Sequence, residues 1–240
     1  MSYPSEIDGV LLVDKSPGMT SHDVVAITRR TLNTRKVGHC GTLDPLATGL
    51  LLITIGRGTK IQDLLMSEDK EYVGTLKLGE VTDSQDSDGH VIETHPVPDF
   101  ARAQVDAAFA KFHGDFYQTP PMVSAIKKDG VPLYKLARQG KEIEREPRFV
   151  HVYAHEILNV RLPEIDFRVV CSKGFYVRTY AHEIGRELGC GAHLRALRRT
   201  KSGRFDVSGA VTIEELKSGP AEAVAARVLS LPAVSRLRGA

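Results

Sequence analysis

Short apolar segments along the chain predict a series of strands joined by turns. An apolar run within 9–15 and another over 50–55 predict buried strands. From 71 to 78 apolar and polar residues alternate, a pattern that predicts a half-buried strand and turns Tyr72 inward. The same alternation recurs over 165–171. The hydrophobic pattern therefore favours a sheet as the centre of the fold.

Capping residues and helical spacing predict helices between these strands. Thr20 and Asp23 have capping-box spacing, so a helix is expected from there through Thr31. Val177, Tyr180, Ala181, Ile184 and Leu188 form an apolar stripe that predicts another helix, which ends at Gly189. Arg178 lies off this stripe in the first turn of the helix, where it can point toward a loop. Two further helices are expected over 59–66 and 133–138. A third is expected to be capped by Asp99 and to have Val105, Ala108, Phe109 and Phe112 on its apolar face, and a fourth is expected to begin with the capping box of Thr212 and Glu215.

Strands outnumber long helices, and several neighbouring strands are joined by short turns. This pattern predicts a mixed α/β (α+β) fold with a central sheet, largely antiparallel or mixed, flanked by helices. Residues 117–148 are rich in charge and in Pro and Gly turns, and predict a mobile, solvent-exposed insertion. At 240 residues the chain fits one large domain, expected over 1–205, with a short tail over 206–240.

Composition narrows the class of protein further. Hydrophobic residues make up 42% and charged residues 26% of the chain, as in ordinary globular proteins. No apolar run approaches the roughly 18 residues that a membrane span needs, and the N-terminus lacks the pattern of a secretory signal. Cys40, Cys171 and Cys190 have no disulfide-framework spacing, so reduced thiols and a cytoplasmic location are expected.

The formal net charge is only +2, but basic residues gather in clusters. A single cluster is often just a solvated face, whereas several on a nearly neutral chain favour a basic groove that faces phosphates. They therefore support an RNA partner. The clusters are Arg29, Arg30, Arg35 and Lys36; Lys127 and Lys128; Lys141, Arg145 and Arg148; and Arg195, Arg198, Arg199, Lys201 and Arg204.

The most informative segment is 38–49, which reads GHCGTLDPLATG and holds one carboxylate, Asp44. An aspartate before proline is a common turn residue, because its side chain bonds nearby backbone amides. This loop, however, leads directly into the apolar run at 50–55. A carboxylate beside a buried strand needs a partner cation or a chemical role. Asp44 is therefore the first candidate for catalysis.

The pattern Gly-His-x-Gly-x-Leu-Asp-Pro-x-Ala-x-Gly resembles the central motif of the TruB family, the tRNA pseudouridine-55 synthases, in which the aspartate is catalytic. Further segments resemble family motifs in the same order, from about Gly9 to Arg204. They are 15–21 (KSPGMTS), 70–72 (KEY), 133–140 (LYKLARQG), which looks like the RNA-contacting insertion, 171–179 (CSKGFYVRT) and 189–199 (GCGAHLRALRR).

Carried over residue by residue, the resemblance implies a site around Asp44, which would attack or deprotonate the ribose or add to the uracil ring. Arg178 would be its ion-pair partner. Tyr72 would stack against the target uracil and is a candidate for handling the C5 proton, and His39 would help to hold the flipped nucleotide. The remaining implied contacts are pocket-lining by Tyr176 and Leu197 and supporting charges from Lys15 and Lys60.

The activity that the resemblance implies is the isomerisation of uridine 55 in the tRNA T-loop to pseudouridine. The N1–C1′ bond breaks, the uracil turns and C5 joins C1′; the base is first extruded, at a cost of a few kcal/mol. This chemistry needs no redox cofactor, metal or nucleoside triphosphate, so no cofactor is expected. The implied partner is the T-stem-loop of tRNA, and we expect a monomer that binds no membrane.

One departure from the family concerns the C-terminus. Members usually carry an RNA-binding domain after the catalytic part, and the roughly 35 residues after Phe205 are too few for it. We therefore expect a catalytic domain over 1–205 without a full C-terminal RNA-binding domain, in a protein that is short by nature or truncated.

Alternative functions predict other features. A non-catalytic RNA-binding or RNA-folding protein would not need the set of Asp44, Tyr72 and Arg178. A carboxylate-dependent glycoside or nucleoside hydrolase would need a second acidic residue as proton donor. A guide-RNA-dependent synthase would bring accessory subunits.

Two segments resemble metal-binding motifs but lack a required ligand or the required spacing. The segment 84–89 resembles a calcium loop, but its twelfth position is His95, where a bidentate glutamate is needed. Cys190 and His193, with Cys40 and His39 elsewhere, lack paired zinc-ligand spacing. No metal is expected.

Overall fold

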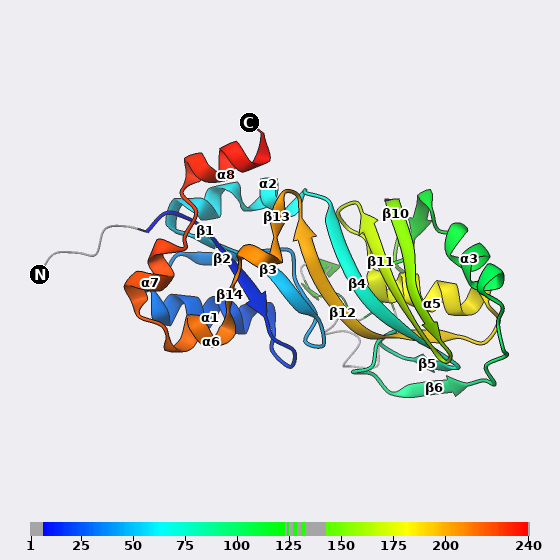
Figure 1. Ribbon diagram of the computed structural model, residues 1–240. Coiled ribbons are helices and arrows are strands. Elements are labelled where there is room, and N and C mark those ends of the chain that lie inside the picture. Colours follow the sequence, from blue (N-terminus) through cyan, green and yellow to red (C-terminus); the bar gives the residue numbers. More distant parts are fainter. Residues whose placement is uncertain (1–6, 123, 125–126, 129–130, 133–142, 240) are drawn as a thin grey trace, which may run out of the picture. The chain divides into compact units, whose positions relative to one another are not determined.

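The computed structural model describes residues 7–122, 124, 127–128, 131–132 and 143–239 (Figure 1). Runs of consecutive strands are separated by single helices over most of the chain, and three helices follow one another at the C-terminal end. The strands are β1 (Gly9–Lys15), β2 (Val37–Cys40), β3 (Thr48–Ile55), β4 (Lys70–Leu78), β5 (Glu80–Thr82), β6 (Val91–Thr94), β7 (Gly114–Gln118), β8 (Lys127–Lys128), β9 (Val131–Pro132), β10 (Arg148–Arg161), β11 (Glu164–Cys171), β12 (Ala192–Ser202), β13 (Phe205–Asp206) and β14 (Val211–Thr212). The helices are α1 (Ser21–Thr31), α2 (Gln62–Met66), α3 (Arg102–Ala110), α5 (Val177–Glu187), α6 (Ile213–Ser218), α7 (Ala221–Ala226) and α8 (Leu231–Arg238), with short 3₁₀ helices η1 (Gly56–Ile61) and η2 (Val207–Gly209).

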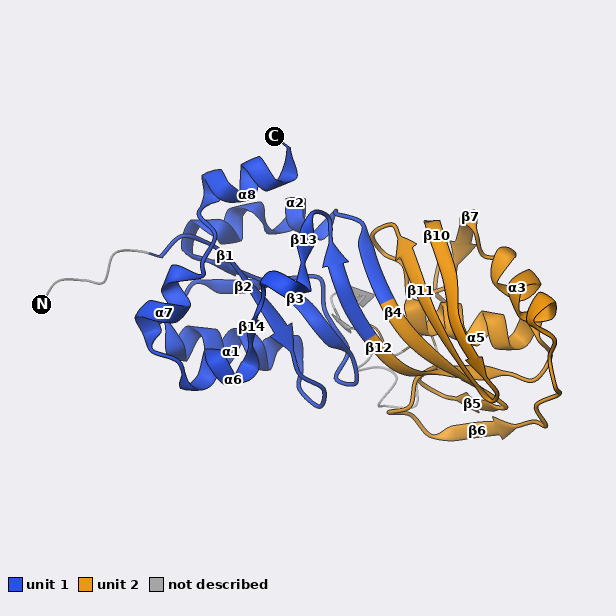
Figure 2. Ribbon diagram, in the orientation of Figure 1, with its two compact units in different colours: residues 1–72, 198–240 blue, residues 73–197 orange. Residues whose placement is uncertain are grey.

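The chain forms two compact units (Figure 2). Unit 1 comprises residues 1–72 and 198–240, and unit 2 comprises residues 73–197. Strands β4 and β12 contribute residues to both units. The expected boundary at residue 205 divides the chain differently and stays a prediction.

Unit 1 is built on a mixed sheet in the order β14-β1-β3-β12. β1 pairs antiparallel with β3 along its whole length, from Gly9 opposite Ile55 to Lys15 opposite Gly49. The other edge of β3 is shared, because β2 pairs antiparallel with its second half and β12 pairs parallel with Thr48 and Gly49 at its start. The connection from β2 to β3 therefore lies beside β12.

Helices and the C-terminal segment complete unit 1. α1 begins as predicted, since Thr20 and Asp23 form the capping box. α1 packs against β2 and α6, and α8 packs against β1. The backbones of Val10 and Leu229 exchange two hydrogen bonds of 2.9 and 2.8 Å. The residues after Phe205 are thus folded onto the N-terminal strand.

Unit 2 combines the strand order β4-β11-β10-β7 with helices α3 and α5. β10 pairs antiparallel with both β11 and β7. The fully buried Phe109, Phe167 and Tyr180 come from α3, β11 and α5, and each pair of their rings lies 5.8 Å apart between centroids. These rings form the core between the helices and the sheet. The predicted fold class, a largely antiparallel or mixed sheet flanked by helices, is confirmed.

Local structure differs from the sequence predictions at two places, and a third prediction is not tested. Asp99 does not cap a helix: α3 begins at Arg102, and Gln104 Oε1 instead accepts a hydrogen bond of 2.9 Å from the Ala101 N–H. The segment 59–66 divides into η1 and α2, because the chain makes a 3₁₀ turn where Gly58 lies against the backbone of Gly9. The predicted helix 133–138 lies outside the described residues.

Candidate active site

Residues 41–47 connect β2 to β3 and carry Asp44 at their centre. The neighbouring Leu43 and Ala47 are 3% and 0% exposed and anchor the loop, whereas Asp44 is half-buried. The Ala47 N–H donates to the Asp44 carbonyl at 3.0 Å and closes a turn after the carboxylate. The Asp44 side chain therefore lies at the boundary between core and solvent, on a loop with fixed ends.

Both chain neighbours of Asp44 are held by residues at the start of α1 and in the turn before it. The Leu43 N–H donates to Ser21 Oγ at 2.9 Å, and Ser21 Oγ lies 3.2 Å from the Leu43 carbonyl, which it can donate to. The Pro45 carbonyl accepts from the Gly18 N–H at 2.9 Å. A carboxylate flanked by two fixed residues is preorganised, so little reorganisation is needed when substrate arrives.

Lys15 supports the same loop from inside the protein. Its side chain is fully buried, and Nζ donates to the carbonyls of Ser16 at 3.0 Å, Met19 at 2.8 Å and Pro45 at 3.3 Å. A buried ammonium needs such acceptors to offset its lost hydration. The structure therefore brings Lys15 to the Asp44 loop as a buried support, and its predicted contact with substrate stays a prediction.

Tyr72 and Lys60, the other residues expected near Asp44 in unit 1, differ in burial. Tyr72 lies on the inward face of β4, as predicted, and is 9% exposed. Lys60 is exposed on η1, which follows the end of β3, whereas the Asp44 loop precedes its start. β3 has 8 residues, so its ends are roughly 23 Å apart. The contacts of both side chains with uracil or RNA stay predictions.

His39 on β2 is half-buried and packs edge-on against His22, with ring centroids 5.1 Å apart and an interplanar angle of 81°. Its Nδ1 is buried and has no hydrogen-bond partner among the residues that the structure describes. Burial, followed by the charges of His22 and Arg199, lowers the pKa of His39 to about 4. The imidazole is therefore neutral at neutral pH and suited to packing against an uncharged base.

This lowered pKa makes stability depend on pH. The unfolded chain binds a proton at His39 near pH 6.5, whereas the folded chain binds it only near pH 4. The contribution of neutral His39 to the free energy of unfolding is therefore complete above pH 6.5 and is lost as the pH falls toward 4. We expect the urea midpoint of wild type to fall more than that of H39N when the pH is lowered from 7 to 4.5. His155 and His182, whose pKa values burial also lowers, are common to both proteins and cancel. A difference that is constant with pH would contradict this assignment.

In unit 2, Arg178 lies in the first turn of α5 and is 3% exposed. Its Nη1 donates to the Ser84 carbonyl at 2.9 Å, and its Nε lies 3.6 Å from Asp86 Oδ2. Asp86 is itself 4% exposed and accepts from the Asp88 N–H at 3.1 Å. Arg178 thus points toward a loop, as predicted, and that loop supplies a buried carboxylate. Sequence reasoning considered Asp86 only as part of an imitation calcium loop and missed this contact.

Tyr176 precedes α5 as its N-cap residue, and a glutamine holds it. Gln118, at the end of β7, donates through Nε2 to the Tyr176 carbonyl at 3.1 Å and accepts from the Tyr176 N–H at 2.7 Å. No sequence signal pointed to Gln118. Leu197 lies on β12 and is 8% exposed. Lining of a uracil pocket by Tyr176 and Leu197 stays a prediction.

Each unit therefore brings together part of the predicted set. Unit 1 joins Lys15 to the Asp44 loop and packs His39 on α1, while unit 2 places Tyr176 and Arg178 at the start of one helix. Asp44 belongs to unit 1 and Arg178 to unit 2. Their ion pair stays a prediction.

The basic cluster over 195–204 is largely neutralised within the protein. Arg195 pairs with Glu164 at 2.7 Å, and Arg198 pairs with Asp14 at 2.6 Å. Arg199 is 1% exposed and cannot face phosphates in this structure. Much of this cluster therefore serves the fold.

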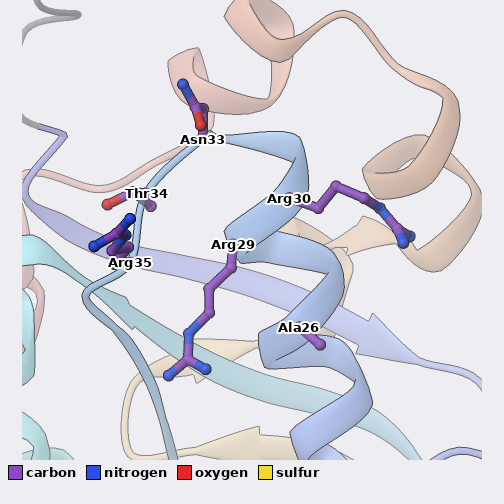
Figure 3. A pocket seen from close by; sticks show the side chains of 6 residues that line it. All are labelled: Ala26, Arg29, Arg30, Asn33, Thr34 and Arg35. Atoms are coloured by element: carbon purple, nitrogen blue, oxygen red, sulfur yellow. The ribbon is translucent and has the colours of Figure 1, made fainter.

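The first basic cluster lies around a hollow of about 440 Å³ at the C-terminal end of α1 (Figure 3). Arg29 donates to the Val37 carbonyl at 2.9 Å, and the guanidinium groups of Arg29, Arg30 and Arg35 point in different directions. They do not converge on a single anion. α1 has 11 residues, so its C-terminal end lies roughly 15 Å from Ser21, which contacts the Asp44 loop.

Among the described residues, no group of three or more histidine, cysteine, aspartate or glutamate side chains is arranged to hold a metal ion. Within those residues, too, no helix has the length and apolar character to cross a bilayer.

Two family models match consecutive parts of the chain. The TruB family pseudouridylate synthase N-terminal domain matches residues 29–177, and the tRNA pseudouridylate synthase B C-terminal domain matches residues 178–230. A protein named tRNA pseudouridine synthase B from Opitutus terrae is 57% identical over 93% of this chain and 93% of its own length. The protein of the same name from Syntrophotalea carbinolica is 52% identical, over 88% of this chain and 69% of its own length.

Solved structures with the same fold include a crystal structure of a Cbf5-Nop10-Gar1 complex and an H/ACA RNP bound to a substrate RNA containing 2′-deoxyuridine. The first is 29% identical with a TM-score of 0.73, covering 96% of this chain and 62% of that one. The second is 30% identical with a TM-score of 0.65, covering 86% of this chain and 51% of that one.

Proposed function

The chain belongs to the TruB family of pseudouridylate synthases, and we propose that it isomerises the uridine at position 55 of the tRNA T-loop, with Asp44 as the catalytic residue. Relatives named tRNA pseudouridine synthase B, at 57% and 52% identity, support an isomerase that acts on uridine in tRNA. The T-loop, the position and the catalytic group are the finer parts of this proposal.

The observation that carries the proposal is the fixed Asp44 loop. Leu43 and Pro45 are held by hydrogen bonds with Ser21, the first residue of α1, and with Gly18 in the turn before it, so the backbone that carries the half-buried Asp44 is fixed on both sides. Isomerisation breaks the N1–C1′ bond and forms a C5–C1′ bond, while C5 loses a proton and N1 gains one. A positioned carboxylate can act on the nucleotide in each route open to the reaction, whether at the ribose or at the ring.

The other side chains have supporting roles in this proposal. Arg178 would hold Asp44 ionised, and a neutral His39 would help to keep the target base out of its loop. Tyr72 would offer a ring for stacking on the uracil, an interaction worth about 1–3 kcal/mol per base. Tyr176 and Leu197 would line the pocket, with Lys15 and Lys60 as supporting charges.

The test is tritium release from a T-stem-loop RNA labelled at C5 of the target uracil. We expect wild-type protein alone to release tritium in step with pseudouridine formation, because C5 exchanges its hydrogen for the bond to C1′. A stem-loop labelled only in uridines outside position 55 is the matched control and should release none. Absence of release from the first RNA would refute the enzyme proposal, and equal release from both would refute the position.

The same assay separates the alternatives. A hydrolase would liberate free uracil, which chromatography distinguishes from pseudouridine in digested RNA. A binding protein would retain the stem-loop without releasing tritium. A synthase that depends on a guide RNA would be inactive alone, and the high identity to relatives named tRNA pseudouridine synthase B favours independent action.

The expected assembly and location belong to the same proposal. We propose a monomer in the cytoplasm whose partner is the T-stem-loop of tRNA. The three cysteines are buried and free, which supports a reducing compartment.

A further inference from the structure

Arg199 is a fully buried arginine to which the proposed mechanism gives no role. It is 1% exposed and is among the largest fully buried side chains of the described residues. In the described part of the chain no acidic side chain forms an ion pair with it; the neighbouring Arg198, in contrast, points outward and bonds both carboxylate oxygens of Asp14, at 2.9 and 2.6 Å. Burying a guanidinium without a counter-ion is costly unless its N–H groups find acceptors.

The acceptors of Arg199 lie on the two sides of the Asp44 loop, one at its first residue and the other in β3 just after it. Nη2 donates to the Gly41 carbonyl at 3.1 Å, where the chain leaves β2. Nε donates to the Leu50 carbonyl at 2.7 Å, and the Arg199 backbone lies opposite Gly49 in the β3–β12 pairing. One residue from β12 therefore contacts the first residue of the loop and the strand into which the loop leads.

Glycines at both ends permit this close approach. Gly49 has a φ of +96°, and a Cβ there would lie 2.2 Å from the Arg199 carbonyl oxygen. Gly41 has a φ of +77°, and a Cβ there would lie 3.3 Å from Arg199 Nη1. Backbone conformation and space thus both select glycine where the loop meets Arg199.

We propose that Arg199 is a positioning residue that ties both ends of the loop and thereby sets where the Asp44 carboxylate lies before RNA binds. This inference rests on the proposed role of Asp44. Ser21 at the start of α1 and Gly18 before it hold Leu43 and Pro45, and Arg199 holds the chain on either side of the loop, at Gly41 and Leu50. The planar guanidinium carries several N–H groups in a fixed fork, whereas a lysine ammonium is a flexible point charge.

The first experiment compares R199K and R199M with R198K, the same change one residue away. The readouts are the single-turnover rate on T-stem-loop RNA at saturating protein, the dissociation constant for that RNA and the melting temperature. A misplacement of about 1 Å costs about 100-fold in rate. We expect about that loss in R199M and a partial loss, about 10-fold, in R199K, while R198K stays within about twofold and RNA affinity is retained throughout.

A second pair of variants consists of G41A, which disturbs the contact with Arg199 without removing the buried cation, and G114A as its control. G41A introduces a methyl group against Nη1, and G114A introduces one at the same kind of backbone position, φ +78°, with nothing within 4 Å. Backbone strain is therefore matched, and only G41A touches Arg199. We expect about a 10-fold slower reaction in G41A and no more than a twofold change in G114A.

These measurements decide the proposal even if R199M fails to fold. Wild-type rates in both R199K and G41A would overturn it, as would a folded R199M at full rate. Losses confined to RNA affinity would also overturn it, because a positioning residue acts on the reaction step. If wild-type protein is itself inactive, the proposed function fails instead, and the two failures are distinct.

Discussion

Asp44→Asn is expected to abolish tritium release, with a fall in single-turnover rate of about 10⁴-fold or more. The amide matches the carboxylate in shape, and the Ala47–Asp44 turn is made by the backbone, so the loop can keep its fold. The amide cannot, however, act as nucleophile or base. Because the loop keeps its fold, affinity for T-stem-loop RNA should stay within about threefold of wild type, as measured by filter binding.

The matched control is Asp63→Asn, an exposed aspartate in α2 of the same unit. This change should leave the rate and the melting temperature as they are. Residual activity above a tenth of wild type in D44N would refute Asp44 as the catalytic residue. Parallel losses of RNA binding and melting temperature would assign it a structural role instead.

Arg178→Met is expected to lower the free energy of unfolding by about 3 kcal/mol, because it leaves Asp86 as a buried charge without this cation. The side chains of Arg178 and Asp86 are 4% and 5% exposed, so water cannot take over the interaction. The double variant R178M/D86N should recover part of the loss, since neither partner then carries a charge. Urea unfolding of the two single variants and the double variant measures the coupling.

A control on the same helix is R186M. Arg186 pairs with Glu183, and their side chains are 65% and 34% exposed. An exposed pair of this kind is worth about 0–1 kcal/mol, so R186M should change stability little. If Arg178 also pairs with Asp44, the double variant regains stability without regaining activity. An R178M variant as stable as wild type would contradict the buried pair.

The elements that the sequence predicted correctly have strong local signals. The capping box of Thr20 and Asp23, the alternation around Tyr72 and the stripe that ends at Gly189 all reappear in the structure. The capping of a helix by Asp99 was wrong because a turn between Pro98 and Phe100 delays the helix to Arg102. Local composition cannot distinguish a helix cap from a turn three residues earlier.

The site was predictable only where residue type and spacing carry chemistry. Asp44 is such a case, since a lone carboxylate in a glycine-rich loop is conspicuous in sequence. Asp86, Gln118 and Arg199 were missed or misjudged because their roles depend on partners far along the chain. Arg199 in particular looked like part of a surface cluster, and only its burial reveals a different role.

The division of the chain into units has a consequence for biosynthesis. Unit 2 is a continuous stretch, 73–197, whereas unit 1 needs both ends of the chain. Val13 lies opposite Val211, and Arg199 reaches back 158 residues to Gly41. During vectorial synthesis on the ribosome, the first seventy-two residues therefore emerge well before their partners, while unit 2 can fold as it appears. We expect the Asp44 loop to take its final form only after release of the chain, so that a stalled or shortened polypeptide carries the aspartate without a finished site.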